Sequence, residues 1–190
     1  MPMPVKTFFL WFFIGFTLQS GTSQSNVPHV QISYFGVLGT HPGIKVGIQY
    51  PVATLNGLSS EKQLHQIIAS PNVIVYFHRR NHLGVGAQLQ VGYQMRQLRG
   101  INVDVMAGVG YLRTIIPNTV YDFDETGGPV RKKWLGTGHF LKTAGLGLGK
   151  TIGSSVDSDF WMIRPTLLQI SPYGTGDILN MAIDAGYYFP

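Results

Sequence analysis

Few residues of this sequence are of types that carry chemistry, and the histidines and their basic neighbours are the first to consider. Several of them fall in segments that we expect to connect strands at one end of the fold, as argued below. These candidate rim residues are His41, His78, Arg79, Arg80, His82 and His139. Imidazoles that converge on one point bind zinc, copper or nickel. These imidazoles come from different segments without paired-ligand spacing to an acid. We therefore predict no metal site, and expect contacts with phosphate groups or water instead.

Nucleophilic catalysis has little support in the sequence. A catalytic serine needs a histidine that activates it and an acid that orients the histidine. No serine lies near a histidine on the outward side of a predicted strand, and Ser158 stands between Asp157 and Asp159 without one. The chain has no cysteine, which excludes a thiolate nucleophile, a thiolate metal site and a disulfide. We therefore expect a protein that is not an enzyme and that has no cofactor.

The elements that position these residues are strands, because apolar and polar residues alternate with a period of two. The clearest segments are 44–50, 85–95, 101–111 and 181–189, and the weaker ones are 30–38, 73–78, 140–152 and 160–170. Successive side chains of a strand point to opposite faces, so each segment has one apolar face and one polar or small face. We count eight such strands. An even number of antiparallel strands predicts an all-β fold, a closed up-and-down barrel.

The composition indicates which face points inward. Charged residues make up only 12% of the chain and glycine contributes 24 residues. A soluble barrel needs many charged residues outside, whereas glycine and short amides suit the narrow lumen of a small barrel. We therefore predict a transmembrane barrel whose apolar face meets lipid; the alternative is a soluble, lipocalin-like carrier barrel. The net charge of +5 comes from charges that are spread thinly, which argues against nucleic-acid binding.

Aromatic residues near the ends of the predicted strands support a membrane location. A barrel in a bilayer carries two girdles of aromatic residues, one at each interface. The expected girdles are Tyr50, Tyr93, Trp161, Tyr187 and Phe189 at one end, with Tyr111 and Phe140 at the other.

The first residues have the pattern of a secretory signal. Lys6 precedes an apolar run at 8–16, and small or polar residues follow at 20–23. Such a run is too short to span a bilayer as a helix. We predict a signal peptide at 1–23, followed by one barrel domain at 24–190.

The last strand adds a resemblance. Residues 180–189, Asn-Met-Ala-Ile-Asp-Ala-Gly-Tyr-Tyr-Phe, alternate and end in an aromatic residue, although Pro190 follows. This ending resembles the small outer-membrane β-barrel proteins of Gram-negative bacteria, many of them uncharacterised. The resemblance implies a location in the cell outer membrane, contact with outer-membrane lipid and lipopolysaccharide, and recognition of the last strand by the barrel-assembly machinery. It also implies that the last strand ends on the periplasmic side, so that 39–42, 79–83, 117–138 and 171–177 face outside.

Two inward-facing charges fall at similar heights on neighbouring strands. Arg164 follows Asp159 by five residues, and Asp184 precedes Phe189 by five. A lone charge in a narrow lumen is costly, whereas a paired charge is tolerated. We predict a contact between Arg164 and Asp184, joined by Asp104, and a plugged lumen rather than an open pore.

Two connecting segments are unusual. The segment 54–71 is long for a periplasmic turn; Ser60 and Gln63 have the spacing of a capping box, and both a short helix and a loose loop are consistent with it. The segment 121–134 places an acidic arm and a basic arm on either side of two glycines, which predicts a projecting hairpin.

These observations together favour a non-enzymatic, monomeric outer-membrane protein whose outer loops have structural, adhesive or ligand-binding roles. Two alternatives stay open: a lipid A-modifying enzyme of the outer leaflet, and the soluble carrier barrel.

Overall fold

The computed structural model describes residues 27–38, 40–55, 58–60, 62–79, 82–116, 120–123, 129–132, 136–155, 157–173 and 176–190. The predicted signal peptide at 1–23 and the rim residue Arg80 lie outside these ranges. Within them, no helix is long and apolar enough to cross a membrane.

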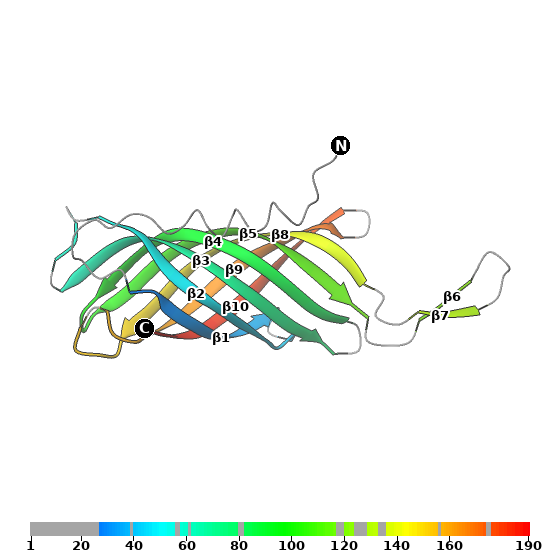
Figure 1. The fold of residues 1–190 in the computed structure, drawn as a ribbon, viewed down its shortest axis with the longest axis horizontal. Helices are drawn as coiled ribbons and strands as arrows, with labels where there is room; N and C mark the ends of the chain where they lie inside the picture. Colours follow the sequence, from blue (N-terminus) through cyan, green and yellow to red (C-terminus); the bar gives the residue numbers. More distant parts are fainter. Residues whose placement is uncertain are drawn as a thin grey trace, which may run out of the picture.

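Antiparallel strands form a closed barrel with the order β1-β10-β9-β8-β5-β4-β3-β2 (Figure 1). The barrel strands are β1 (His29–Val37), β2 (Gly43–Thr54), β3 (Gln63–His78), β4 (His82–Gln97), β5 (Ile101–Ile115), β8 (Gly136–Thr151), β9 (Phe160–Tyr173) and β10 (Gly176–Phe189). Each barrel strand pairs with its neighbours along the chain, and β1 closes the ring against β10. The predicted eight-stranded up-and-down barrel is confirmed.

A separate hairpin distinguishes the two ends of the barrel. It consists of β6 (Val120–Phe123) and β7 (Pro129–Lys132), which pair from Val120 opposite Lys132 to Phe123 opposite Pro129. Figure 1 shows that this hairpin projects from one end of the barrel and that the C-terminus lies at the other. We call these the hairpin end and the C-terminal end.

The outward faces of the barrel strands are apolar and the inward faces are largely polar. Exposed apolar residues occur on every barrel strand, for example Ile32, Ile44, Val73, Leu89, Val105, Leu146, Ile163 and Met181. Buried polar residues occur on the opposite faces, for example Gln31, Lys45, Asn72, Gln88, Asp104, Thr143, Arg164 and Asp184. A soluble barrel has the reverse distribution. The arrangement is therefore that of a barrel whose outer wall meets lipid, as the strand alternation predicted.

The lumen is not polar throughout. Towards the hairpin end a cluster of buried apolar side chains fills it, with contributions from β1, β3, β5, β8, β9 and β10. The cluster consists of Phe35, Val37, Ile74, Tyr76, Leu112, Leu141, Leu168, Ile170 and Ala182. The charged residues of the lumen thus lie on the C-terminal side of an apolar layer.

The segment 54–71 is neither a helix nor a loose loop over most of its length. From Gln63 onward it belongs to β3, which pairs with β4 without interruption from Gln63 opposite Gln97 to His78 opposite His82. This continuous ladder outweighs the weak local helical pattern, since an isolated helix of this length is marginal. Pro71 obscured the strand because it cannot donate to the ladder, and the pairing of β3 with β2 is interrupted beside it.

Candidate functional site

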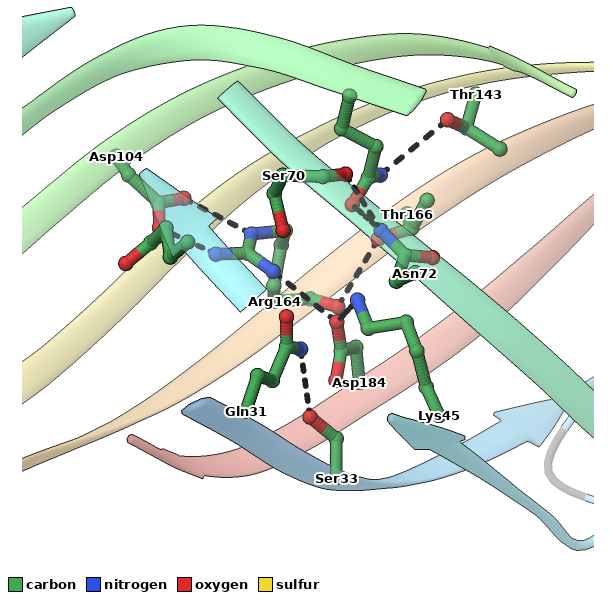
Figure 2. A network of polar contacts seen from close by, with 12 residues as sticks. Gln31, Ser33, Lys45, Ser70, Asn72, Asp104, Thr143, Arg164, Thr166 and Asp184 are labelled. Atoms are coloured by element: carbon green, nitrogen blue, oxygen red, sulfur yellow. Dashed lines mark hydrogen bonds and ion pairs between the residues drawn. The ribbon is translucent and has the colours of Figure 1, made fainter. Parts of the chain in front are cut away.

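A charged network occupies the middle of the lumen, centred on Arg164 of β9 (Figure 2). Its Nε donates to Asp104 Oδ1 at 2.9 Å, and its Nη2 donates to the second oxygen of the same carboxylate. Its Nη1 donates to Asp184 Oδ2 at 3.0 Å and to the Tyr188 hydroxyl at 3.2 Å. Lys45 Nζ of β2 donates to the same oxygen of Asp184. The network pairs two cations with two carboxylates and is therefore neutral overall.

A column of side chains continues from this network towards the C-terminal end. Tyr188 stacks on Phe160 with ring centroids 4.5 Å apart and planes inclined by 7°. The guanidinium of Arg96 lies 5.1 Å from the centre of the Phe160 ring and donates to Asp157 at 3.1 Å. Together with the apolar layer towards the hairpin end, these contacts place interacting side chains along the described lumen.

The structure thus brings Arg164, Asp184 and Asp104 together, and it adds Lys45, which the sequence argument left out of the pair. The sequence did indicate that Lys45 faces the lumen, because it alternates with the outward-facing apolar residues of its strand. Its partner Asp184 lies 139 residues away, however, and no local spacing relates the two. None of the four charged groups of the network is exposed, so the network is suited to support the barrel rather than to meet a substrate.

A second group of polar residues lies on the outward wall near the hairpin end, and we call it the outer polar patch. It consists of Lys142 of β8, Gln169 and Ser171 of β9, and Asp177 of β10. Ser171 Oγ donates to Asp177 Oδ1 at 2.5 Å, and Gln169 Nε2 donates to Asp177 Oδ2 at 2.8 Å. Lys142 is opposite Gln169 in the ladder between β8 and β9.

The patch interrupts an apolar surface. Leu167 precedes Gln169 and Ser171 on the outward face of β9 and is 50% exposed, and Leu179 on β10 is 69% exposed. A hydroxyl group that donates to a carboxylate has a proton acceptor in place, which is the arrangement that activates a nucleophile. Gln169 holds the other carboxylate oxygen and so fixes the orientation of Asp177.

The sequence argument missed this pair because it assigned 171–177 to a loop. Ser171 instead belongs to the end of β9 and Asp177 to the start of β10, so the two residues lie across a hairpin from each other. The signal that could have found them is the sequence Gly-Thr-Gly at 174–176, since glycines favour turns, with a serine three residues before it and an aspartate directly after it.

The histidine of the nearest strand points elsewhere. His139 of β8 is buried in the lumen, where its Nδ1 donates to the carbonyl oxygen of Pro172 at 2.5 Å and its Nε2 lies 3.1 Å from Thr114 Oγ1. The outer polar patch therefore pairs a serine with a carboxylate on the outward wall, while His139 points into the lumen.

Three of the predicted rim histidines lie together at the hairpin end. The rings of His41 and His78 are stacked with centroids 3.9 Å apart, and those of His78 and His82 are 5.1 Å apart. Burial and the neighbouring His78 ring lower the pKa of His41, which lies in the turn after β1. Arg79 follows His78 in the adjacent turn, where its carbonyl oxygen lies 3.2 Å from His78 Nδ1. As they lie, no three histidine or acidic residues of the described ranges are arranged around a common point as metal ligands.

The predicted girdle residues lie on the outward wall; five of them are exposed and two are half-buried. Tyr50, Tyr111, Phe140, Trp161 and Tyr187 are exposed. Tyr111 is opposite Phe140 near the hairpin end, and Tyr187 is opposite Trp161 near the C-terminal end. Phe189 is half-buried, and Tyr93 is half-buried against His65, whose Nδ1 contacts its hydroxyl.

Comparisons with known proteins give one informative match. No family model matches the chain, and no curated protein matches it either. Among solved structures, the crystal structure of the outer membrane enzyme PagL is similar, with a TM-score of 0.52 and 11% sequence identity over 85% of this chain and 99% of that chain. A likeness at this identity establishes the fold, a closed outer-membrane barrel.

The match corrects the functional expectation. The sequence argument concluded that the chain is a non-enzymatic barrel, chiefly because no serine–histidine pair was visible. A solved barrel of the same fold is an enzyme, which contradicts that conclusion. The error was to take a missing sequence motif as evidence against catalysis, since on a barrel wall the reacting groups come together across strands.

Proposed function

We propose that this protein is an outer-membrane enzyme that modifies lipid A of the outer leaflet at an acyl ester bond, with Ser171 as the nucleophile. The observation that carries the proposal is the contact between Ser171 Oγ and Asp177 on the outward wall. The fold that the chain shares with the outer membrane enzyme PagL supports it independently.

The position of the outer polar patch suits a lipid substrate. A lipid approaches a barrel sideways, so its ester carbonyl can reach only groups on the outward wall. Leu167 and Leu179 offer apolar surface to the acyl chain, while Ser171 and Asp177 lie nearer the hairpin end, where polar headgroups begin. With the hairpin end outside, as the strand parity predicts, the patch faces the outer leaflet.

The chemistry proceeds by acyl transfer to the serine. Ser171 Oγ forms a bond to the carbonyl carbon while its proton passes to Asp177. The ester C–O bond then breaks, and the leaving oxygen takes that proton from Asp177. A water molecule attacks the acyl-enzyme in turn, gives its proton to Asp177, and releases the fatty acid as Ser171 Oγ takes the proton back. The ammonium group of Lys142, across the strand from Gln169, offers positive charge to the oxyanion or to a phosphate of the substrate.

Mass spectrometry of lipid A tests this proposal. The full chain, refolded in detergent, is incubated with lipid A, and the wild-type protein is expected to release a fatty acid. Ser171→Ala should reduce the rate by about a thousandfold or more, because it removes the nucleophile. Ser154→Ala, in an exposed turn at the C-terminal end, is the matched control and should retain full activity. Unchanged lipid A with the wild-type protein, or equal activity of Ser171→Ala, would contradict the proposal.

A further inference from the structure

Two cations lie on the outward wall beside the outer polar patch, along the seam between β5 and β8. Arg113 of β5 is opposite Gly138 of β8, and Lys142 of β8 is opposite Val109 of β5. Both cationic side chains are exposed. Tyr111 of β5 is also exposed and lies between them in height. We call Arg113, Tyr111 and Lys142 the cationic strip.

Two glycines of β8 show where the side chains of Arg113 and Tyr111 lie. A β-carbon at position 138 would collide with the hydroxyl of Tyr111, and one at position 136 would lie 3.1 Å from Arg113 Nε. Tyr111 is opposite Phe140 and Arg113 is opposite Gly138, so each side chain crosses to the glycine two residues nearer the hairpin end. The absence of side chains at Gly136 and Gly138 therefore lets both polar groups extend along the wall.

Lys142 leans in the same direction. Its Nζ lies 5.9 Å from the centre of the Phe140 ring, and Phe140 is two residues nearer the hairpin end on β8. Long cationic side chains on a lipid-facing wall extend in this way towards a polar interface. The ammonium group of Lys142, the hydroxyl of Tyr111 and the guanidinium of Arg113 therefore follow one another towards the hairpin end.

Neither cation of the strip has an acidic partner in the part of the chain that the structure describes. The ion pairs found there involve Lys45, Arg96 and Arg164 only. On the outward wall, the nearby carboxylate of Asp177 accepts hydrogen bonds from two neutral groups of the outer polar patch. Arg113 and Lys142 are therefore available to an anion from outside the protein.

We propose that the cationic strip binds a phosphate group of a phosphorylated lipid of the surrounding membrane. A guanidinium group donates parallel hydrogen bonds to a phosphate, and an ammonium group and a hydroxyl group add further donors. A lipid fits this position better than a soluble anion does, because the strip adjoins apolar surface. Val105 and Val109 continue the outward face of β5 away from the hairpin end, and both are exposed. Acyl chains can lie on that surface while the phosphate meets the strip.

The strip is close to the proposed nucleophile. Tyr111 of β5 and Ser171 of β9 are opposite Phe140 on its two sides. Neighbouring strands are about 4.8 Å apart, so roughly 10 Å separates the backbones of Tyr111 and Ser171. A lipid held by its phosphate can thus present an ester of the same headgroup to Ser171. The binding proposal does not rest on the proposed acyl transfer, because it holds whether or not an ester is cleaved.

Native mass spectrometry of the full chain, refolded in detergent, tests the proposal. The probes are phosphorylated lipid A and the same lipid after removal of its phosphates. Ser171→Ala is the parent chain, so that the lipid stays intact whether or not the wild type cleaves it. The parent should bind the phosphorylated lipid more tightly by about tenfold or more. Equal affinity for the two lipids would overturn the proposal. Displacement of the lipid by inorganic phosphate at the same concentration would identify a site for the free anion and would also overturn it.

Removal of the two cations should remove the preference for phosphate. Arg113→Met and Lys142→Met are added together to the parent chain. The matched control is Lys62→Met with Lys150→Met, which removes two exposed cations at the C-terminal end and should bind like the parent. Heat-modifiable gel migration shows whether each variant is folded. An unchanged preference in the folded Arg113→Met, Lys142→Met variant, or an equal loss in the control, would overturn the proposal.

A further variant tests the geometry of the strip without changing a charge. Gly138→Ala places a methyl group against the Tyr111 hydroxyl, so the tyrosine must move. We expect the preference for the phosphorylated lipid to fall by about threefold. Gly176→Ala is the matched control, since a β-carbon there would meet nothing within 4 Å, and it should bind like the parent. An unchanged preference in folded Gly138→Ala would overturn the assignment of Tyr111 to the site.

Discussion

The lumen and the outward wall of this barrel both hold carboxylates, but they surround them differently. In the lumen, Asp104 and Asp184 are buried and contact the cations Arg164 and Lys45. On the outward wall, Asp177 is exposed, and its two oxygens accept hydrogen bonds from the neutral groups of Ser171 and Gln169. The same side chain therefore serves two purposes in one barrel.

The two kinds of carboxylate differ in the cost of protonation. A proton on Asp104 or Asp184 would leave a buried cation uncompensated in a lumen closed by side chains, which is costly. A proton on Asp177 would leave no buried charge, since the group is exposed and its partners are neutral. The comparison assigns stability to the lumen network and proton transfer to the outer polar patch. Each prediction below changes one of the two regions.

Arg164→Met should have the largest effect on stability. It removes the cation that holds both lumen carboxylates, and breaking a buried ion pair in this way costs about 3–5 kcal/mol. The refolded protein is unfolded with urea in detergent, and the folded fraction is read from its heat-modifiable gel migration. Arg113→Met, at an exposed outward position on β5, should leave the unfolding midpoint unchanged. Equal midpoints for Arg164→Met and the wild type would break the comparison.

Lys45→Met should destabilise the barrel less. Asp184 would keep its contact with Arg164, so only one of its two cationic partners is lost. We expect a loss of about 1–3 kcal/mol in the free energy of unfolding, with the enzyme activity per folded molecule unchanged. A loss as large as that of Arg164→Met would mean that Lys45, rather than Arg164, is the centre of the network.

Gln169→Ala should have the smallest effect, and it should fall on activity alone. Gln169 is a positioning residue, because it holds the second oxygen of Asp177 while Ser171 occupies the first. We expect kcat to fall by about tenfold with KM and the unfolding midpoint unchanged. Ile101→Ala, at an exposed outward position at the start of β5, is the control for lost surface area. A rise in KM with unchanged kcat would instead place Gln169 in substrate binding.

The barrel could be predicted from the sequence because its signal is local. Alternation with a period of two is visible within one strand, and the low share of charged residues then fixes which face is outside. The heights of Arg164 and Asp184 could be compared because both lie near the end of the chain on neighbouring strands. The part of β3 before the predicted segment 73–78 was missed because its evidence is the long ladder with β4, which only the paired structure reveals.

The candidate sites were harder to predict because they depend on side chains from different strands. Strand parity places His41, His78 and His82 at one end but cannot show that their rings touch. The pair of Ser171 and Asp177 depends on where β9 ends and β10 begins, and strand ends are the least certain part of a prediction from sequence. The contact of Lys45 with Asp184 was missed because the two residues are 139 positions apart in the sequence.

The most direct test makes the same chemical change in both regions. Asp177→Asn and Asp184→Asn each replace a carboxylate by an amide of nearly equal size. Activity on lipid A and urea unfolding are measured for both variants. We predict that Asp177→Asn loses activity by about a hundredfold or more and unfolds like the wild type, whereas Asp184→Asn unfolds at lower urea and stays active while folded. Full activity of Asp177→Asn, or loss of activity in folded Asp184→Asn, would contradict the division between the outer polar patch and the lumen.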